Sequence, residues 1–273
     1  MAVYITGDTH GYIDIGKLSF ERWPESRCFS DDDYLIICGD FGLVWDNSKT
    51  ELQWRKWLDN KPYTTLFCSG NHSNFDMLYT FPVVDFCGGK ARQISDKIFL
   101  LQRGECYTIC GKKYFTMGGA SSHDISDGIL DPNDPDFAEK YMSMSRMNKM
   151  FRVNHVSWWK EEIPSDEEFA HAEETLKKNN YKFDYIISHC APNTIVDKLS
   201  MYSYNHDKLT DWFEDNVYNK CEYKAWFFGH YHLDNMYNGN KSKKNIPHVC
   251  SYYEIHNADE YVEEYNNFLD RLK

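Results

Sequence analysis

The sequence lacks the features that would place it in several broad classes of protein. No apolar run approaches the ~20 residues that a membrane-spanning helix requires, and no pair of its nine cysteines has the CxxC spacing of a zinc knuckle or redox site. Basic residues are also outnumbered by acidic ones. The 30 lysines and arginines against 42 acidic residues give a formal charge of −12. That field repels nucleic-acid polymers and anionic lipid, so we expect neither a nucleic acid nor a membrane as partner.

What is present is the composition of a globular protein. The chain has 273 residues, of which 42% are hydrophobic and 16% aromatic, enough to form a core without disulfides or structural zinc. We expect one domain over residues 1–273, and no pattern indicates an oligomeric state. The first seven residues, MAVYITG, already resemble a strand and leave no room for a signal peptide. We therefore expect a cytoplasmic, reducing environment.

Short apolar runs alternate with helical patterns, which predicts a mixed α/β fold. The runs predicted as buried strands are residues 3–6, 34–38, 64–68, 185–188 and 225–228. Helices are predicted over residues 51–59, over 165–179 and in the last sixteen residues, the second of them beginning with a capping box. Closely spaced turns over residues 97–117 predict a β-meander in a second, partly antiparallel sheet.

The polar stretch at about 118–164 is much longer than an ordinary connection and predicts a loop or lid inserted into the domain. Methionines at helical spacing predict a short helix around residues 144–150. We expect Arg146, Arg152 and His155 of this stretch to be solvated, the alternative being contact with a substrate phosphate.

Five polar motifs each fall where an apolar run ends: GDTHG, GDFG, GNH, SHC and GHYH. The carboxyl ends of strands in an α/β sheet lie along one edge, so we expect all five motifs at one crevice. Together they supply carboxylate, imidazole and amide donors, namely Asp8, His10, Asp40, Asn71, His189, His230 and His232. Seven such donors suit two ions, and a set without thiolates suits Mn²⁺, Fe or Zn²⁺.

The order DxH, GD, GNH, H and GHxH, from Asp8 to His232, resembles the pattern of the calcineurin-like metallophosphoesterase superfamily. The resemblance implies a four-layer sandwich with two central mixed β-sheets flanked by helices. It implies a metal-bridging hydroxide that attacks phosphorus, with His72 beside the leaving group as general acid or charge stabiliser. It also implies a first metal site with Asp8, His10, Asp40 and His232, and a second with Asp40, Asn71, His189 and His230, so that Asp40 bridges and takes part in catalysis.

The function expected from this resemblance is metal-dependent hydrolysis of a phosphodiester or phosphomonoester. Diesters are favoured, because the arginine of the VDRG run in the phosphoprotein-phosphatase branch is absent after Gly39-Asp40. We expect two divalent ions, Mn²⁺ first with Fe or Zn²⁺ as alternatives, and a small phosphoester substrate, a nucleotide being one option. Ser122 and His123, which follow a predicted strand, are candidate substrate-binding residues.

One position departs from the superfamily pattern. Asp or Glu commonly follows the histidine of GNH, where this chain has Ser73. A carboxylate that orients His72 would then come from elsewhere, and Asp76 is a candidate. The departure also leaves open an alternative function, a catalytically weak module that binds metal and a phosphate ligand or a protein.

Overall fold

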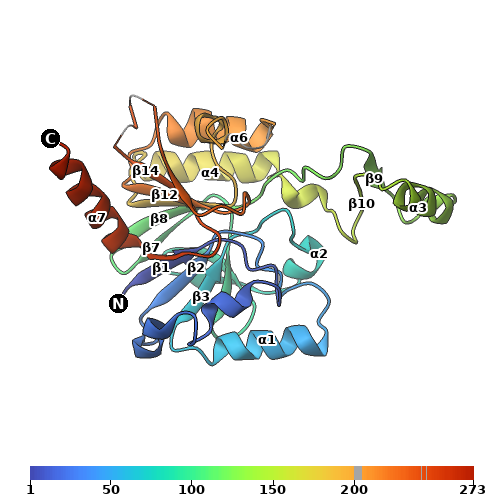
Figure 1. The fold of residues 1–273 in the computed structure, drawn as a ribbon, viewed down its shortest axis with the longest axis horizontal. Coiled ribbons are helices and arrows are strands. Elements are labelled where there is room, and N and C mark those ends of the chain that lie inside the picture. The colour runs from blue at the N-terminus through green and yellow to red at the C-terminus, as the bar shows by residue number, and fades with distance from the viewer. Residues whose placement is uncertain (200–204, 241, 244) are drawn as a thin grey trace.

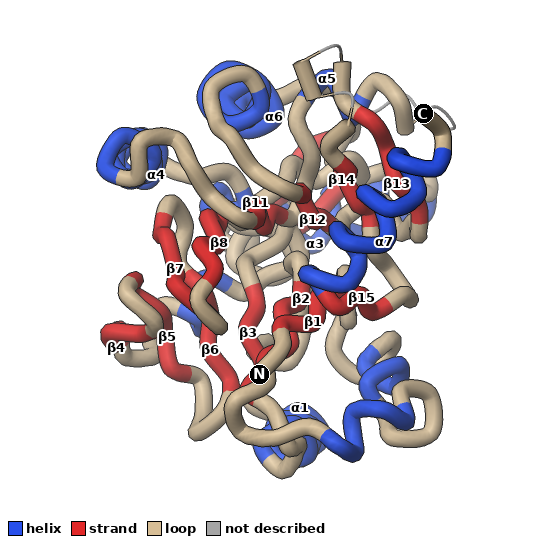
Figure 2. Tube along the Cα trace, turned by 90° about the vertical axis from the view of Figure 1, so that its left-hand side faces the viewer, coloured by secondary structure: helices blue, strands red, loops and turns tan. Residues whose placement is uncertain are grey.

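A computed structural model describes residues 1–199, 205–240, 242–243 and 245–273 of the chain. In this described part, two large mixed β-sheets stack face to face and helices cover their outer faces (Figure 1). Figure 2, viewed from the side of the C-terminal helix, shows the two layers of strands with helices above and below them. The four-layer sandwich expected from the sequence is therefore confirmed.

Among the described residues, the first sheet has seven strands in the order β15-β1-β2-β3-β6-β5-β4. Strands β1, β2, β3 and β6 pair in parallel, whereas β15, β5 and β4 add antiparallel edges. Its strands are β1 (Val3–Thr6), β2 (Tyr34–Ile37), β3 (Thr64–Phe67), β4 (Val83–Phe86), β5 (Gly89–Gln93), β6 (Ile98–Leu101) and β15 (Ile255–Asn257).

The second sheet has six strands within the described ranges, in the order β13-β14-β12-β11-β8-β7. Strands β8, β11, β12 and β14 pair in parallel, and β7 and β13 form antiparallel edges. Its strands are β7 (Glu105–Ile109), β8 (Lys112–Met117), β11 (Tyr185–Ser188), β12 (Ala225–Phe228), β13 (Asn235–Asn238) and β14 (Pro247–Cys250).

The meander predicted over residues 97–117 is wrong in one respect. Strand β6 belongs to the first sheet, and only β7 and β8 form a hairpin in the second. The chain passes from one sheet to the other through a turn at Gly104, whose φ is 74° and whose N–H donates to Thr116 O. Apolar patterning identifies a strand but not which of two sheets it joins.

Strand residues alternate between two kinds of core, as the period of a strand requires. Ile36, Ile187 and Phe227 face the space between the two sheets. Leu35 packs on the side of α1, and Trp226 packs on the side of α4 and α6. Both faces of each sheet are thus buried, which explains the continuous apolar runs.

The predicted helices are present, with their capping residues in place. The principal helices are α1 (Lys49–Asp59), α4 (Asp166–Lys178), α6 (Lys208–Trp212) and α7 (Ala258–Arg271). Ser165 and Glu168 form the expected capping box of α4, and Asn257 caps α7. The apolar face predicted for α7 is only partly buried, because Phe268 and Leu272 at its end are exposed. No helix in the described ranges is both long and apolar enough to cross a membrane.

Shorter helical segments occupy the connections between these elements. They are η1 (Ile15–Leu18), η2 (Pro24–Cys28), α2 (Phe75–Leu78), η3 (Lys160–Glu162), α5 (Asn193–Val196) and η4 (Phe213–Tyr218).

The long stretch after β8 forms an arm that projects from the sandwich (Figure 1). It carries β9 (Gly128–Leu130), α3 (Phe137–Arg146) and β10 (Phe151–Val153), and β9 and β10 pair in parallel. Helix α3 begins before the expected residues 144–150 and ends within them, and none of its residues is buried. The arm returns to the sandwich through the residues after β10.

Candidate metal centre

Strands of both sheets end at one edge of the sandwich and bring the predicted donors together. Asp8 follows β1, Asp40 follows β2 and Asn71 follows β3. In the second sheet, His189 follows β11 directly and His230 follows β12. The strands within each of these groups are parallel, so their donors emerge at equivalent ends.

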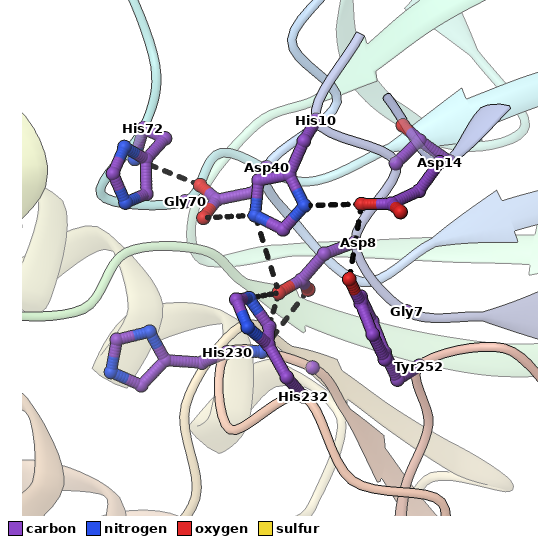
Figure 3. Close-up of polar contacts among 12 residues, drawn as sticks. Gly7, Asp8, His10, Asp14, Asp40, Gly70, His72, His230, His232 and Tyr252 are labelled. Atoms are coloured by element: carbon purple, nitrogen blue, oxygen red, sulfur yellow. Dashed lines mark hydrogen bonds and ion pairs between the residues drawn. The ribbon is translucent and has the colours of Figure 1, made fainter. Parts of the chain in front are cut away.

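Asp8 and Asp40 form the buried centre of this cluster (Figure 3). His232 Nε2 lies 3.1 Å from Asp8 Oδ2. Asp40 Oδ2 lies between two imidazoles, 3.7 Å from His10 Nε2 and 3.4 Å from His189 Nε2. Two sets of three donor atoms, each set within 4.8 Å, can be drawn from these residues, and both include Asp8.

The remaining predicted donors, Asn71 and His230, lie beside His189 at the same cluster. Asn71 Oδ1 is 3.1 Å from His189 Nε2. The backbone N–H of His230 donates to Asp8 Oδ1 over 3.1 Å, and its ring centroid lies 5.0 Å from that of His189. The structure therefore brings together all seven donors singled out in the sequence.

The ionised forms of the two buried carboxylates are stabilised by positive charge close to them. Burial opposes ionisation of Asp40, but His189 and His10 outweigh burial and hold its pKa well below the ordinary value. Burial also opposes protonation of both histidines, yet the carboxylates raise the pKa of each to about 9. Burial and the neighbouring His189 lower the pKa of His230 to about 3. Divalent cations fit a pocket where carboxylates and a neutral imidazole converge.

Four of the predicted ligands themselves adopt a left-handed backbone conformation. The φ angles are 42° at His10, 43° at Asp40, 67° at His230 and 51° at His232. Residues with a side chain rarely adopt this region, and such outliers cluster at functional sites. The turns after β1, β2 and β12 are therefore built to aim ligand side chains at a common point.

The glycines before two of these ligands are required by close approach. A Cβ atom at Gly39 would lie 2.0 Å from His189 Nδ1, and one at Gly70 would lie 2.1 Å from Asp40 Oδ1. Both contacts are far inside van der Waals distance. The glycines of the GD and GNH motifs thus let donors from different strands pack directly against the backbone.

Further residues, which the motifs did not reveal, orient the ligands. Asp14 Oδ2 binds His10 Nδ1 at 2.8 Å and accepts a hydrogen bond from the Tyr252 hydroxyl (Figure 3). Nδ1 of His189 lies 2.7 Å from Cys38 O. In both histidines, Nε2 is left facing Asp40. The spacing of Asp14, four residues after His10, is a sequence signal that could have identified this pair.

Lys17 supports the turn after β1 from beneath. Its Nζ donates to the backbone oxygens of Gly7 at 3.0 Å and Asp8 at 2.8 Å, and also to that of Tyr252. Burial lowers the pKa of this ammonium to about 8. A cation beneath Asp8 stabilises the backbone that carries the carboxylate, and no sequence motif marked it.

Arg152 lies beside His72, contrary to the expectation that it is solvated. Its Nη1 and Nη2 atoms are each 3.2 Å from a ring nitrogen of His72. Asp124 holds the guanidinium through Nε at 2.7 Å and Nη2 at 2.8 Å, and the side chain is only 13% exposed. Burial and the arginine charge lower the pKa of His72, although Asp40 opposes this effect. The sequence offered no signal that this arginine returns to the cluster.

Asp76, considered from the sequence as a partner of His72, has other partners, and that prediction is wrong. Its carboxylate lies 2.8 Å from His155 Nδ1 and accepts from Trp159 Nε1 at 2.7 Å. The backbone N–H of His72 instead donates to Asp40 Oδ1 at 2.8 Å. His155, which is exposed, and Trp159, which is buried, both contact Asp76, so this segment packs against α2.

Ser73 has a local structural use. Its Oγ accepts a hydrogen bond from Gly70 N over 3.0 Å, within the same turn. The side chain that replaces the common carboxylate therefore closes the turn that presents Asn71 and His72.

Ser122 and His123, the candidate substrate residues, lie in different environments. Ser122 is buried, donates to Glu162 Oε2 at 2.6 Å and accepts from Asn71 Nδ2 at 3.3 Å. His123 is exposed, and its ring centroid lies 6.0 Å from that of His230. The structure thus places Ser122 behind a predicted ligand and His123 at the open side of the cluster.

Two cavities open beside the cluster. One of about 330 Å³ is bordered by His10 and His72 and is lined mainly by apolar side chains. The other, of about 440 Å³, is bordered by His230 and has more polar walls, including His123. The cluster is therefore accessible from two differently lined spaces.

Buried carboxylates, imidazoles and an amide at the strand ends of two stacked sheets define a metal-dependent hydrolase. The family model for the calcineurin-like phosphoesterases matches residues 1–234, so the chain belongs to this family. The resemblance drawn from the motifs is confirmed, and the chain is a metal-dependent phosphoric ester hydrolase.

Two solved structures are similar to this chain at low sequence identity. The phosphopantetheinyl hydrolase PptH from Mycobacterium tuberculosis is 14% identical, with a TM-score of 0.45 over 92% of this chain and 90% of that one. The protein of unknown function AQ665 from Aquifex aeolicus is 18% identical, with a TM-score of 0.25 over 59% of this chain and 81% of that one. No curated protein matches the chain significantly in sequence.

Proposed function

We propose that this protein uses two divalent metal ions to hydrolyse a small phosphoester, with diesters favoured over monoesters. The observation that carries the proposal is the convergence of Asp8 and Asp40, both buried, with five further donors, three of which form sets of donor atoms within 4.8 Å that include these carboxylates. A single ion cannot use all of them, whereas two ions sharing one carboxylate can.

The residues fit two neighbouring sites. Asp40 Oδ2 lies between His10 and His189, which supports Asp40 as the shared ligand. The first ion would be held by Asp8, His10, Asp40 and His232, and the second by Asp40, Asn71, His189 and His230. Two ions bound here would supply Lewis acidity, which neutralises phosphate charge and activates water at neutral pH. Mn²⁺ is our first choice, with Fe or Zn²⁺ as alternatives, since nitrogen and oxygen donors suit all three.

His72 and Arg152 act at the leaving oxygen in this proposal. The pKa of His72 is lowered by burial and by Arg152, which favours the neutral imidazole at physiological pH. An imidazole N–H and a guanidinium beside it can stabilise negative charge as it develops on the leaving oxygen. Charge stabilisation is therefore the better supported of the two roles considered for His72.

The two cavities support the preference for diesters. A monoester carries one substituent on phosphorus and a diester carries two. Here one space borders His72 and the other borders His230, so both substituents of a diester, such as a cyclic nucleotide or a linear nucleotide diester, have room. We propose His123 as a contact for the retained substituent and Ser122 as a residue that orients Asn71.

We also place the protein in the cytoplasm. All nine cysteines lie in the described part of the chain and are free thiols. Free thiols in this number are typical of a reducing compartment.

Hydrolysis of a nitrophenyl monoester and a bis-nitrophenyl diester, measured side by side, tests the function. Metal-free protein is supplied with Mn²⁺, Mg²⁺ or Zn²⁺ in turn, and Asp40→Asn is compared with Asp215→Asn, a change at an exposed aspartate of η4. We expect turnover with wild type and Asp215→Asn, its loss in Asp40→Asn, and faster diester hydrolysis. Full activity in Asp40→Asn would contradict the site, and faster monoester hydrolysis would contradict the substrate preference.

A further inference from the structure

The cavity beside His72 is bordered by two loops that also carry metal ligands. Tyr12 and Ile13 come from the loop after β1, and Leu43 and Trp45 from the loop after β2. His10 and His72 complete the wall toward the metal centre, with ring centroids 6.0 Å apart. Any group in this cavity therefore lies next to both a ligand and the residue proposed to act on the leaving oxygen.

The rim of the cavity exposes side chains that are normally buried. Tyr12 and Ile13 are each 69% exposed, two and three residues after His10. Large apolar side chains displayed together beside a polar centre are typical of a binding surface.

The opposite wall is held in a fixed position. Leu43 is buried at the base of the cavity. The backbone N–H of Trp45 donates to Glu51 Oε2 at 2.8 Å, and its ring makes an edge contact with Trp159 at 5.3 Å. A flat apolar group that packs against Trp45 in this cavity would therefore meet a preformed surface.

The lining of the cavity includes two acidic side chains and no lysine or arginine. Asp46 is an exposed lining residue, and its carboxylate accepts from Ser48 N at 2.8 Å. Glu51, the other acid of the lining, is buried and paired with Arg55. The lining itself contributes no lysine or arginine, so away from His72, which contacts Arg152, an anionic substituent would meet the carboxylate of Asp46.

We propose that this cavity is the leaving-group subsite and that the leaving alcohol carries a flat apolar group and no negative charge. The inference rests on the proposed function and narrows its substrate class. In the reaction, water oxygen bonds to phosphorus, the bond from phosphorus to the alcohol oxygen breaks, and the alcohol departs with a proton derived from the water. The alcohol released is then the substituent that occupied the space between Tyr12 and Trp45.

Internal competition between two alcohols tests this assignment. One assay uses the mixed diester benzyl methyl phosphate, and a parallel assay uses an equimolar mixture of benzyl phosphate and methyl phosphate. In both assays the two leaving alcohols, benzyl alcohol and methanol, have similar acidity. We expect benzyl alcohol to exceed methanol by about tenfold or more in wild type, as an apolar pocket discriminates. The product ratio does not depend on the fraction of protein that is folded.

The variant Tyr12→Ser/Ile13→Ser should reduce this ratio to about threefold or less. Tyr141→Ser, at a 45% exposed tyrosine of α3 outside the cavity, is the matched control and should leave the ratio unchanged. Asp46→Asn should increase hydrolysis of 4-carboxybenzyl phosphate relative to benzyl phosphate.

Three results would overturn the assignment: equal release of the two alcohols by wild type, an undiminished ratio in the double variant, or no effect of Asp46→Asn. Failure of the underlying function is distinguishable, because neither alcohol nor nitrophenol would then be released with any of the metals.

Discussion

The terminal guanidinium nitrogens of Arg152 lie 3.2 Å from the two ring nitrogens of His72. The two residues are 80 positions apart in sequence, and Arg152 stands at β10, where the projecting arm returns to the sandwich. Asp124, from the outgoing side of the same arm, fixes the guanidinium through two hydrogen bonds. The arm thus contributes a cation to the His72 side of the cluster, and residues from both its outgoing and its returning segment form this contact.

Arg152→Lys should lower kcat about 100-fold with a smaller change in KM. Lysine keeps the charge but cannot bind Asp124 through two nitrogens while contacting His72, so the donor is misplaced where negative charge develops. Steady-state kinetics on the better nitrophenyl ester would measure the effect. Arg146→Lys, at the end of α3, is the control and should retain wild-type rates. Equal kcat values for Arg152→Lys and wild type would show that the arginine has only a structural role.

Metal binding should stabilise the fold through Asp8. Free Mn²⁺ at about 100 times its dissociation constant adds about 2.7 kcal/mol to the free energy of unfolding, which raises Tm by about 5 °C for a chain of this size. Asp8→Asn removes a buried negative charge from the proposed ligand set and should abolish this increase. Calorimetry of metal-free and metal-loaded protein measures the difference, with Asp215→Asn as the variant that should respond normally. If metal raised the Tm of Asp8→Asn as much as that of wild type, Asp8 would not be a metal ligand.

The hydrogen bonds that link Glu162 to Ser122 and Ser122 to Asn71 should control the affinity of the protein for metal. Ser122 accepts from the amide nitrogen of Asn71, which leaves the amide oxygen facing His189. Ser122→Ala removes that restraint and should weaken metal binding or activity about 10- to 100-fold, as loss of an orienting partner commonly does. Titration of metal-free protein with Mn²⁺ measures the affinity, and Ser121→Ala next to it is the control. Unchanged affinity in Ser122→Ala would show that Asn71 is oriented by other contacts.

Local signals in the sequence accounted for most elements and for the convergence of the candidate ligands. Strands buried on both faces appear as continuous apolar runs, and helix caps such as Ser165 act over a few residues, so both are visible in a short window. The candidate ligands were singled out because the motifs that carry them fall where such runs end. Their convergence required only the rule that parallel strands end at one edge.

What was missed depends on contacts between distant segments. The pairing of Arg152 with His72 follows from the path of the arm, which no local pattern encodes. No sequence signal distinguishes Lys17 from a surface lysine, but the fold buries it beneath Asp8. The division of strands β6 and β7 between two sheets was missed for the same reason, since apolar alternation carries no information about a strand's partner.

Asp33 should make folding stability depend on pH in the acid range. Burial opposes its ionisation, but N–H donors of Ser30 and Ala2 outweigh burial and lower its pKa below 3.8. A carboxyl whose pKa is lowered on folding stabilises the protein above its unfolded pKa and loses that contribution as the pH falls toward the folded value. Asp33→Asn should therefore cost about 1 kcal/mol at pH 7 and lose less stability than wild type between pH 4 and pH 2. Urea unfolding at several pH values, with the exposed Asp32→Asn as control, measures this, and parallel curves for Asp33→Asn and wild type would contradict it.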